Sequence, residues 1–172
     1  MVRSPRWELE SQVAPQGEVA ALAVGFSRVA RQNHHFIVQS SMTVELILLA
    51  ASIIFGIVHI TVVSHLQSVQ RGYRWTASSR EREVAPLVGL AGRVERALRN
   101  YLETFPFFAA AILAVSVTNA HSWLTVWGAH CYFWGRVAYA ILYAADLPLA
   151  RSLVWNIPTV GILMIVIGSF TR

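Results

Sequence analysis

The chain of 172 residues is 55% hydrophobic and only 13% charged, and its mean hydropathy is +0.50. This composition excludes an ordinary soluble domain and indicates an integral-membrane protein, with the lipid bilayer as its surroundings. The net charge of +5 comes from 14 arginines, with no lysine, against nine acidic residues. Because the arginines flank apolar stretches instead of forming a soluble basic domain, we interpret them as cytoplasmic loop charge and expect no nucleic-acid partner.

The sequence has one cysteine, Cys131. A single cysteine excludes an internal disulfide and a CxxC redox pair, which argues against a thiol oxidoreductase that works through its own dithiol. No P-loop, GxGxxG or HExxH motif occurs, and we predict no metal site.

Residues 1–41 are rich in polar residues, and their one apolar patch, residues 19–26, is too short to span a membrane. They also lack the layout of a signal peptide. Met42 stands directly before the first long apolar run, so two interpretations stay open: a disordered extramembrane tail, or an over-extended gene start with the natural product beginning at Met42. A mature chain that begins at Met1 would contradict the second interpretation.

Four apolar runs follow, and they predict an all-α, integral-membrane four-helix bundle over residues 42–172. Between them lie an arginine-rich loop, a turn at 119–122 and a tight connector at 147–152. The predicted spans are residues 43–66, 90–118, 123–145 and 153–170.

The distribution of arginines predicts the orientation of these spans. Seven arginines lie between residues 67 and 99, whereas the turn at 119–122 has none. By the positive-inside rule, the arginine-rich loops face the cytoplasm and both termini face outward. We therefore expect a multi-pass protein of a bacterial inner membrane.

The second predicted span opens with a polar ribbon on one face. At about 100° per residue, Arg93, Arg96, Asn100 and Glu103 fall within roughly 80° of one another, with Arg99 just outside that arc. The opposite face is apolar. An apolar window of about 20 residues within this span begins near residue 98, so the lower part of the ribbon reaches the membrane boundary.

The third predicted span carries a second polar stripe. Its members again fall within about 80° on a helical wheel: Tyr132, Arg136, Tyr139, Tyr143 and Asp146. Because a short turn joins the second and third spans, they should lie antiparallel and adjacent, with the two stripes at the same end of the membrane.

Counting along the two helices places Arg93 level with Asp146 and Glu103 level with Arg136. One interpretation is that these pairs are salt bridges that only hold the helices together. Salt bridges leave a surplus of positive charge, however, since, apart from Glu95, no acids remain to neutralise three further arginines. Unpaired arginines beside tyrosines at the cytoplasmic edge favour a pocket for an anionic, polar ligand. The surplus residues are Arg96, Arg99 and Arg151.

Three motifs resemble the MAPEG family, the membrane-associated proteins in eicosanoid and glutathione metabolism. They are RVERALRNYLE at 93–103, GRVAYxxxY at 135–143 and the pair Arg151-Ser152. The motifs occur in the order and spacing expected of the family, and the similarity runs from about residue 43 to residue 170.

The resemblance implies a homotrimer that binds glutathione as co-substrate between subunits, near the cytoplasmic side. It also implies that Arg151 stabilises the glutathione thiolate, with Ser152 beside it. A guanidinium close to a thiol lowers the thiol pKa, which agrees with this role. The positions that match glutathione-binding residues of the family are Arg96, Arg99, Asn100, Glu103, Arg136, Tyr139 and Tyr143.

Our leading hypothesis is a glutathione-dependent transferase or peroxidase that acts on a small lipophilic electrophile. A second is a non-catalytic membrane binding or scaffold protein with the same fold. A third is a small four-span exporter of lipophilic cations, but that class requires a mid-membrane carboxylate in its first helix, and Glu45 lies at the end of the first span.

Overall fold

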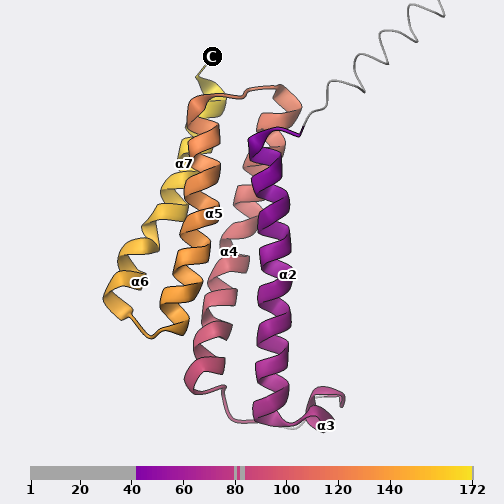
Figure 1. Ribbon diagram of the computed structural model, residues 1–172. Coiled ribbons are helices and arrows are strands. Elements are labelled where there is room, and N and C mark those ends of the chain that lie inside the picture. Colours follow the sequence, from indigo (N-terminus) through magenta and orange to yellow (C-terminus); the bar gives the residue numbers. More distant parts are fainter. Residues whose placement is uncertain (1–41, 80, 82–83, 172) are drawn as a thin grey trace, which may run out of the picture. The chain divides into compact units, whose positions relative to one another are not determined.

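The structure is a computed structural model that describes residues 42–79, 81 and 84–171. Both interpretations of residues 1–41 lie outside the described residues. Every regular element in the described part is a helix (Figure 1). The elements are α2 (Val44–Arg71), α3 (Tyr73–Thr76), α4 (Gly89–Thr118), α5 (Trp123–Ala144), α6 (Pro148–Val154) and α7 (Asn156–Phe170).

Three stretches of the described chain are long and apolar enough to cross a membrane: α2, α4 and the segment Pro148–Phe170 that contains α6 and α7. Helix α5 has 22 residues but is not among these three stretches. It contains His130 and Arg136 together with several tryptophans and tyrosines. The all-helical prediction and its apolar helices are therefore confirmed.

The helices of the structure differ from the predicted spans and connectors at two places. Helix α2 runs five residues beyond the predicted end and stops at Arg71, where Gly72 adopts φ 90° and its N–H bonds to the carbonyl of Ser68. Such a positive φ favours glycine, so the chain can turn there at little cost.

The second difference is at the predicted connector 147–152, which contains most of the short helix α6. Pro148 lies in its first turn, where a proline's fixed φ suits a helix and its missing N–H is not needed. Helical bonds run from Arg151 N to the Leu147 carbonyl and from Trp155 N to the Arg151 carbonyl, each 3.0 Å. Arg151 therefore lies on a helix and not in a loop.

Helices α2, α4, α5 and α7 pack along one another, and α5 makes its most extensive contact with α7. Gly128 and Gly161 allow that contact, since a Cβ atom on Gly128 would lie 2.6 Å from the Gly161 carbonyl oxygen. Phe108 of α4 stacks on Tyr132 of α5 with ring centroids 3.9 Å apart. These rings belong to a buried cluster with aliphatic side chains from α2, α4, α5 and α7.

The predicted turn at 119–122 is confirmed, and a buried carboxylate anchors it. Asn119 ends α4 in the left-handed conformation, and Ser122 begins α5 with a capping box. Glu45, in the first turn of α2, accepts hydrogen bonds from Thr125 Oγ1 (2.7 Å) and pairs with His121 Nδ1 (3.0 Å). This contact ties the start of α2 to the α4–α5 turn. Because the turn is short and the two helices contact each other, α4 and α5 are adjacent and antiparallel.

Candidate functional site

The polar ribbon of α4 and the stripe of α5 face each other, as the sequence predicts. Arg93 NH1 lies 3.4 Å from Asp146 Oδ2, and Arg93 Nε donates to the carbonyl of Ala144 at 3.2 Å. Asp146 follows α5 with φ 62°, a conformation that ends the helix. This ion pair joins the beginning of α4 to the end of α5.

Arg136 is the most buried charged group of the site, with 2% of its surface exposed. Its NH1 donates to Asn100 Oδ1 and its NH2 donates to Thr104 Oγ1. The rings of Tyr132 and Tyr139 lie 5.6 and 5.9 Å from its guanidinium carbon. Such distances permit cation–π attraction, which offsets part of the cost of burying the charge.

Arg136 lies level with this part of α4, as the count along the helices predicts, but it forms no salt bridge with Glu103. Asn100 and Thr104 are four residues apart and share one face of α4, so both can reach the guanidinium. Glu103 lies about 100° around the helix from Thr104 and is exposed. An amide and a hydroxyl therefore hold Arg136, and its positive charge is not neutralised by a hydrogen-bonded carboxylate.

Two further arginines converge on Tyr143. Arg96 Nε donates to the Tyr143 hydroxyl at 3.3 Å, and its guanidinium carbon lies 5.8 Å from the ring centroid. The guanidinium carbon of Arg151, from α6, lies 4.3 Å from the same centroid. The Tyr139 ring meets the Tyr143 ring edge-on, with centroids 5.4 Å apart. Side chains from α4, α5 and α6 thus all contact Tyr143.

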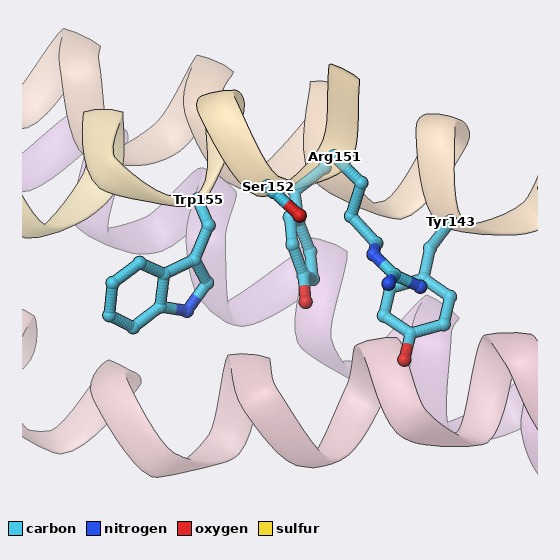
Figure 2. Close-up of a pocket in the computed structure, with 5 residues that line it drawn as sticks. Tyr143, Arg151, Ser152 and Trp155 are labelled. Carbon is cyan, nitrogen blue, oxygen red and sulfur yellow. The ribbon is translucent and has the colours of Figure 1, made fainter. Parts of the chain in front are cut away.

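A cavity of about 270 Å³ opens beside this tyrosine pair. Figure 2 shows Arg151, Ser152 and Trp155 projecting from one side of the α6 segment, with the Arg151 guanidinium next to the Tyr143 ring. The Ser152 hydroxyl lines the cavity and donates to the Pro148 carbonyl at 2.9 Å.

Most of the predicted site residues therefore come together, in two linked groups. One group holds Asn100 and Arg136, the other holds Arg96, Tyr143, Arg151 and Ser152, and Tyr139 contacts both. Arg99 and Glu103 do not join either group. Both are exposed on α4 and make no hydrogen bond to another residue in the described part of the chain.

Three contributing residues were missed from the predicted site set. Thr104 lies four residues after Asn100, and Trp155 lies four residues after Arg151, so helical spacing would have placed each on the same face as a predicted residue. Tyr132 belongs to the predicted stripe of α5 but was not assigned to the site.

The electrostatics of the site are dominated by unneutralised positive charge. Across residues 42–79, 81 and 84–171, Arg93–Asp146 is the one ion pair between an arginine and a carboxylate. The guanidiniums of Arg96, Arg136 and Arg151 instead contact tyrosines, an amide and a hydroxyl. Such a site suits an anionic ligand with carboxylates. The same described residues contain no group of three or more His, Cys, Asp or Glu that could hold a metal ion.

The fold and site define a helical membrane protein with an arginine- and tyrosine-lined cavity at one end of its helices. The family model described as "MAPEG family" matches residues 47–171. The chain belongs to the MAPEG family, which confirms the resemblance seen in the sequence. No curated protein sequence and no solved structure matches the chain.

Proposed function

We propose that the protein is a glutathione-dependent membrane enzyme that transfers the glutathione thiolate to, or reduces, a lipophilic electrophile. One observation carries this proposal: Arg96 and Arg151, from different helices, converge on Tyr143 beside an open cavity, without a carboxylate to neutralise them. Family membership supports the fold and the membrane setting on which the proposal depends.

Glutathione fits the chemistry of these residues. It carries two carboxylates and one ammonium at neutral pH, and it supplies a thiol when bound. The carboxylates suit the guanidiniums of Arg96 and Arg99, because arginine can bind a carboxylate through two parallel hydrogen bonds. Arg136 is buried and bonded to Asn100 and Thr104, so it would contribute by holding Asn100 and by its positive charge. The exposed carboxylate of Glu103 suits the ammonium, and the amide of Asn100, held by Arg136, can bind the peptide groups.

Arg151 is the residue that we assign to the thiol. A nearby guanidinium stabilises a thiolate and so lowers the thiol pKa, which raises the fraction of the nucleophilic form. Arg151 lies on α6, which continues into the apolar helix α7, so it stands between the polar cavity and the membrane-facing helices. A lipophilic substrate can then reach the thiolate laterally from the bilayer.

We also propose that α5 spans the membrane with α2, α4 and α7, as a four-helix bundle in a bacterial inner membrane. Helix α5 is long enough to cross, and Arg136 and Tyr143 contact α4 and α6, away from lipid. The arginine-rich α2–α4 loop and α6 would face the cytoplasm. Reporter fusions at the C-terminus test this orientation: an alkaline phosphatase fusion should be active and a green fluorescent protein fusion dark.

A homotrimer would give the exposed charges of α4 a partner. Arg99 and Glu103 lie beside the apolar part of α4, where a charge facing lipid is costly. A second copy of the chain could cover them and complete the glutathione site between subunits. Native mass spectrometry of the detergent-solubilised protein tests this assembly, and a monomer at all concentrations would contradict it.

The decisive experiment measures glutathione binding, together with transferase and peroxidase turnover, on purified detergent-solubilised protein. The wild-type protein is compared with the Arg151→Ala variant and with Arg74→Ala, a matched control at an exposed arginine of α3 outside the cavity. Turnover should fall sharply in Arg151→Ala and stay unchanged in Arg74→Ala.

Two other results would reject the enzyme. No glutathione binding at millimolar concentration would reject glutathione as co-substrate. Binding without turnover, unaffected by Arg151→Ala, would instead favour a non-catalytic binding or scaffold protein. An exporter of lipophilic cations suits the structure less well, because Glu45 is held by Thr125 and His121 in the first turn of α2 and not at mid-helix.

A further inference from the structure

Two buried hydrogen bonds join α2 to α4. His59 Nε2, on α2, donates to the carbonyl oxygen of Val94 at 3.2 Å, and the Tyr101 hydroxyl, on α4, donates to the carbonyl oxygen of Ser52 at 2.5 Å. Each helix therefore supplies one donor side chain and one backbone acceptor. Both donor side chains are buried, since His59 is 6% exposed and Tyr101 is 3% exposed. We call these two bonds the α2–α4 clamp.

The two bonds of the clamp have the same spacing on both helices. Ser52 and His59 are seven residues apart, and so are Val94 and Tyr101. Seven residues make nearly two turns, or about 10.5 Å, so each pair lies on one face of its helix. The helices run antiparallel, so the bonds lie at the two ends of one contact (Figure 1). Together they fix how far α4 slides along α2 and how it is rotated about its own axis.

Gly56 gives Tyr101 access to the carbonyl of Ser52. Gly56 follows Ser52 by four residues, and a Cβ atom there would lie 2.9 Å from Tyr101 Cε1. Without that atom the tyrosine ring lies directly against α2, where Phe55 packs on it edge-on with centroids 5.6 Å apart. A glycine inside a helix costs about 1 kcal/mol relative to alanine, and here the close contact requires it.

His59 takes part through one defined tautomer. The carbonyl of Val94 can only accept, so Nε2 carries the proton. Nδ1 is buried and has no hydrogen-bond partner among the described residues. A second proton on Nδ1 would be left unsatisfied, so the neutral Nε2–H form fits this site. A glutamine side chain can offer an N–H group close to the position of Nε2, whereas a leucine side chain cannot donate.

The clamp acts on the helix that carries the polar ribbon, but from a different side. At about 100° per residue, Val94 and Tyr101 point roughly 115° away from the centre of Arg93, Arg96 and Asn100. None of the residues that line the arginine-lined cavity belongs to α2. Any influence of α2 on that cavity therefore passes through α4.

The ribbon is sensitive to the rotation of α4. A rotation of about 20° would move an atom about 6 Å from the helix axis by roughly 2 Å. Arg93 lies 3.4 Å from Asp146, and Arg96 donates to the Tyr143 hydroxyl at 3.3 Å. Because hydrogen bonds to nitrogen donors weaken beyond about 3.2 Å, such a rotation would break these contacts between α4 and α5.

We propose that His59 and Tyr101 are positioning residues for the arginine-lined cavity, although neither lines it. Their two bonds hold α4 at the rotation at which Arg93 and Arg96 reach α5. Loss of either bond lets α4 rotate, which moves the arginines and weakens binding of an anionic ligand. The inference rests on the proposed function only in taking glutathione as that ligand.

The test compares His59→Leu and Tyr101→Phe with the wild-type full-length protein in detergent, well below the unfolding temperature. Each substitution removes one bond of the clamp, and Tyr101→Phe keeps the ring. Isothermal titration calorimetry should show about fivefold weaker glutathione binding in each, the effect of roughly one hydrogen bond. His59→Gln should bind like the wild-type protein, because its amide restores the donor. A role in stability alone would lower the unfolding midpoint and leave the affinity unchanged.

A second measurement does not need glutathione. Phenylglyoxal modifies arginine side chains, and peptide mass spectrometry gives the initial rate at each one. The Arg93 side chain is 25% exposed and pairs with Asp146, whereas Arg99 is exposed and serves as the internal reference. The rate at Arg93 relative to Arg99 should rise about threefold in His59→Leu and in Tyr101→Phe, the effect of losing one partly exposed ion pair. It should stay at the wild-type value in His59→Gln.

Tyr73→Phe and His65→Leu are matched controls, because these exposed side chains bond each other away from the clamp. Both should keep the wild-type affinity and labelling. Unchanged labelling of Arg93 in either His59→Leu or Tyr101→Phe would overturn the proposal. It also fails if the labelling changes but the glutathione affinity does not, or if His59→Gln behaves like His59→Leu. Tyr101→Phe decides alone if His59→Leu does not fold.

Failure of this proposal is distinguishable from failure of the proposed function. A wild-type protein that does not bind glutathione would reject glutathione as co-substrate, while the labelling of Arg93 would still show whether the clamp holds α4. A protein that binds glutathione equally well with and without the clamp loses only the positioning proposal.

Discussion

The guanidinium of Arg151 lies over the ring of Tyr143, 4.3 Å from its centroid, and this contact brings α6 to α5 at the edge of the cavity. Arg96 reaches the same tyrosine from α4 through its hydroxyl. Tyr143 therefore holds both arginines in place through two different parts of one side chain, and each part can be removed separately.

Tyr143→Leu should weaken glutathione binding by about tenfold, because losing the ring frees both arginines and their ordering then opposes binding. Tyr143→Phe keeps the ring beneath Arg151 and removes only the hydrogen bond from Arg96, so it should weaken binding by a few fold. Isothermal titration calorimetry in detergent measures both. Equal losses in the two variants would show that the hydroxyl, and not the ring, matters.

Arg136→Lys should destabilise the protein by about 1–3 kcal/mol, since an ammonium cannot bond both Asn100 and Thr104 in the geometry of a planar guanidinium. The thermal unfolding midpoint in detergent should fall accordingly. Arg99→Lys is the matched control on α4, because Arg99 is exposed, and its effect should stay within about 0.5 kcal/mol. An unchanged midpoint in Arg136→Lys would contradict the two-bond arrangement.

Glu45→Gln should lower stability by about 1–3 kcal/mol, because the charged acceptor of Thr125 and His121 becomes a neutral amide inside the protein. Glu95→Gln serves as control, since Glu95 is only half-buried on α4. A double-mutant cycle with His121→Ala measures the coupling directly. Additive effects of the two substitutions would show that Glu45 and His121 do not interact.

Gly128→Ala should destabilise the α5–α7 contact by about 1–3 kcal/mol, because the added methyl group would meet the Gly161 carbonyl oxygen at 2.6 Å. Gly161→Ala should act similarly, since its Cβ atom would lie 2.6 Å from the Gly128 carbonyl oxygen. The unfolding midpoints of the two single variants report this. A midpoint equal to that of the wild-type protein in both would mean that the helices are further apart than in the structure.

Helical periodicity predicted the elements and most of the site. The two polar stripes were visible because arginines and tyrosines recur at about 100° per residue, and the antiparallel turn then placed Arg93 beside Asp146. Counting residues along the two helices shows which residues lie level with Arg136, but not which of them point toward it. Glu103 and Thr104 are adjacent in sequence but point in directions about 100° apart.

Helix α6 was missed for a different reason. Residues 147–152 contain a proline and no apolar period of their own, and they become helical through bonds to the neighbouring turn at Trp155. Of the two salt bridges that the sequence left open, Arg93–Asp146 forms and Glu103–Arg136 does not, because an amide and a hydroxyl on the facing side of α4 bond the guanidinium instead.

The close contact of Gly128 with Gly161 also influences the position of Arg151, which lies elsewhere in the structure. Gly161 follows Arg151 by ten residues, roughly 15 Å along the α6–α7 segment. Trp155, the residue that joins the two helices, has a helical backbone conformation. A displacement of this segment at the glycine pair therefore also moves Arg151. A methyl group added at either glycine would shift Arg151 relative to Tyr143, so the arrangement of side chains at the cavity depends on a contact that lies outside it.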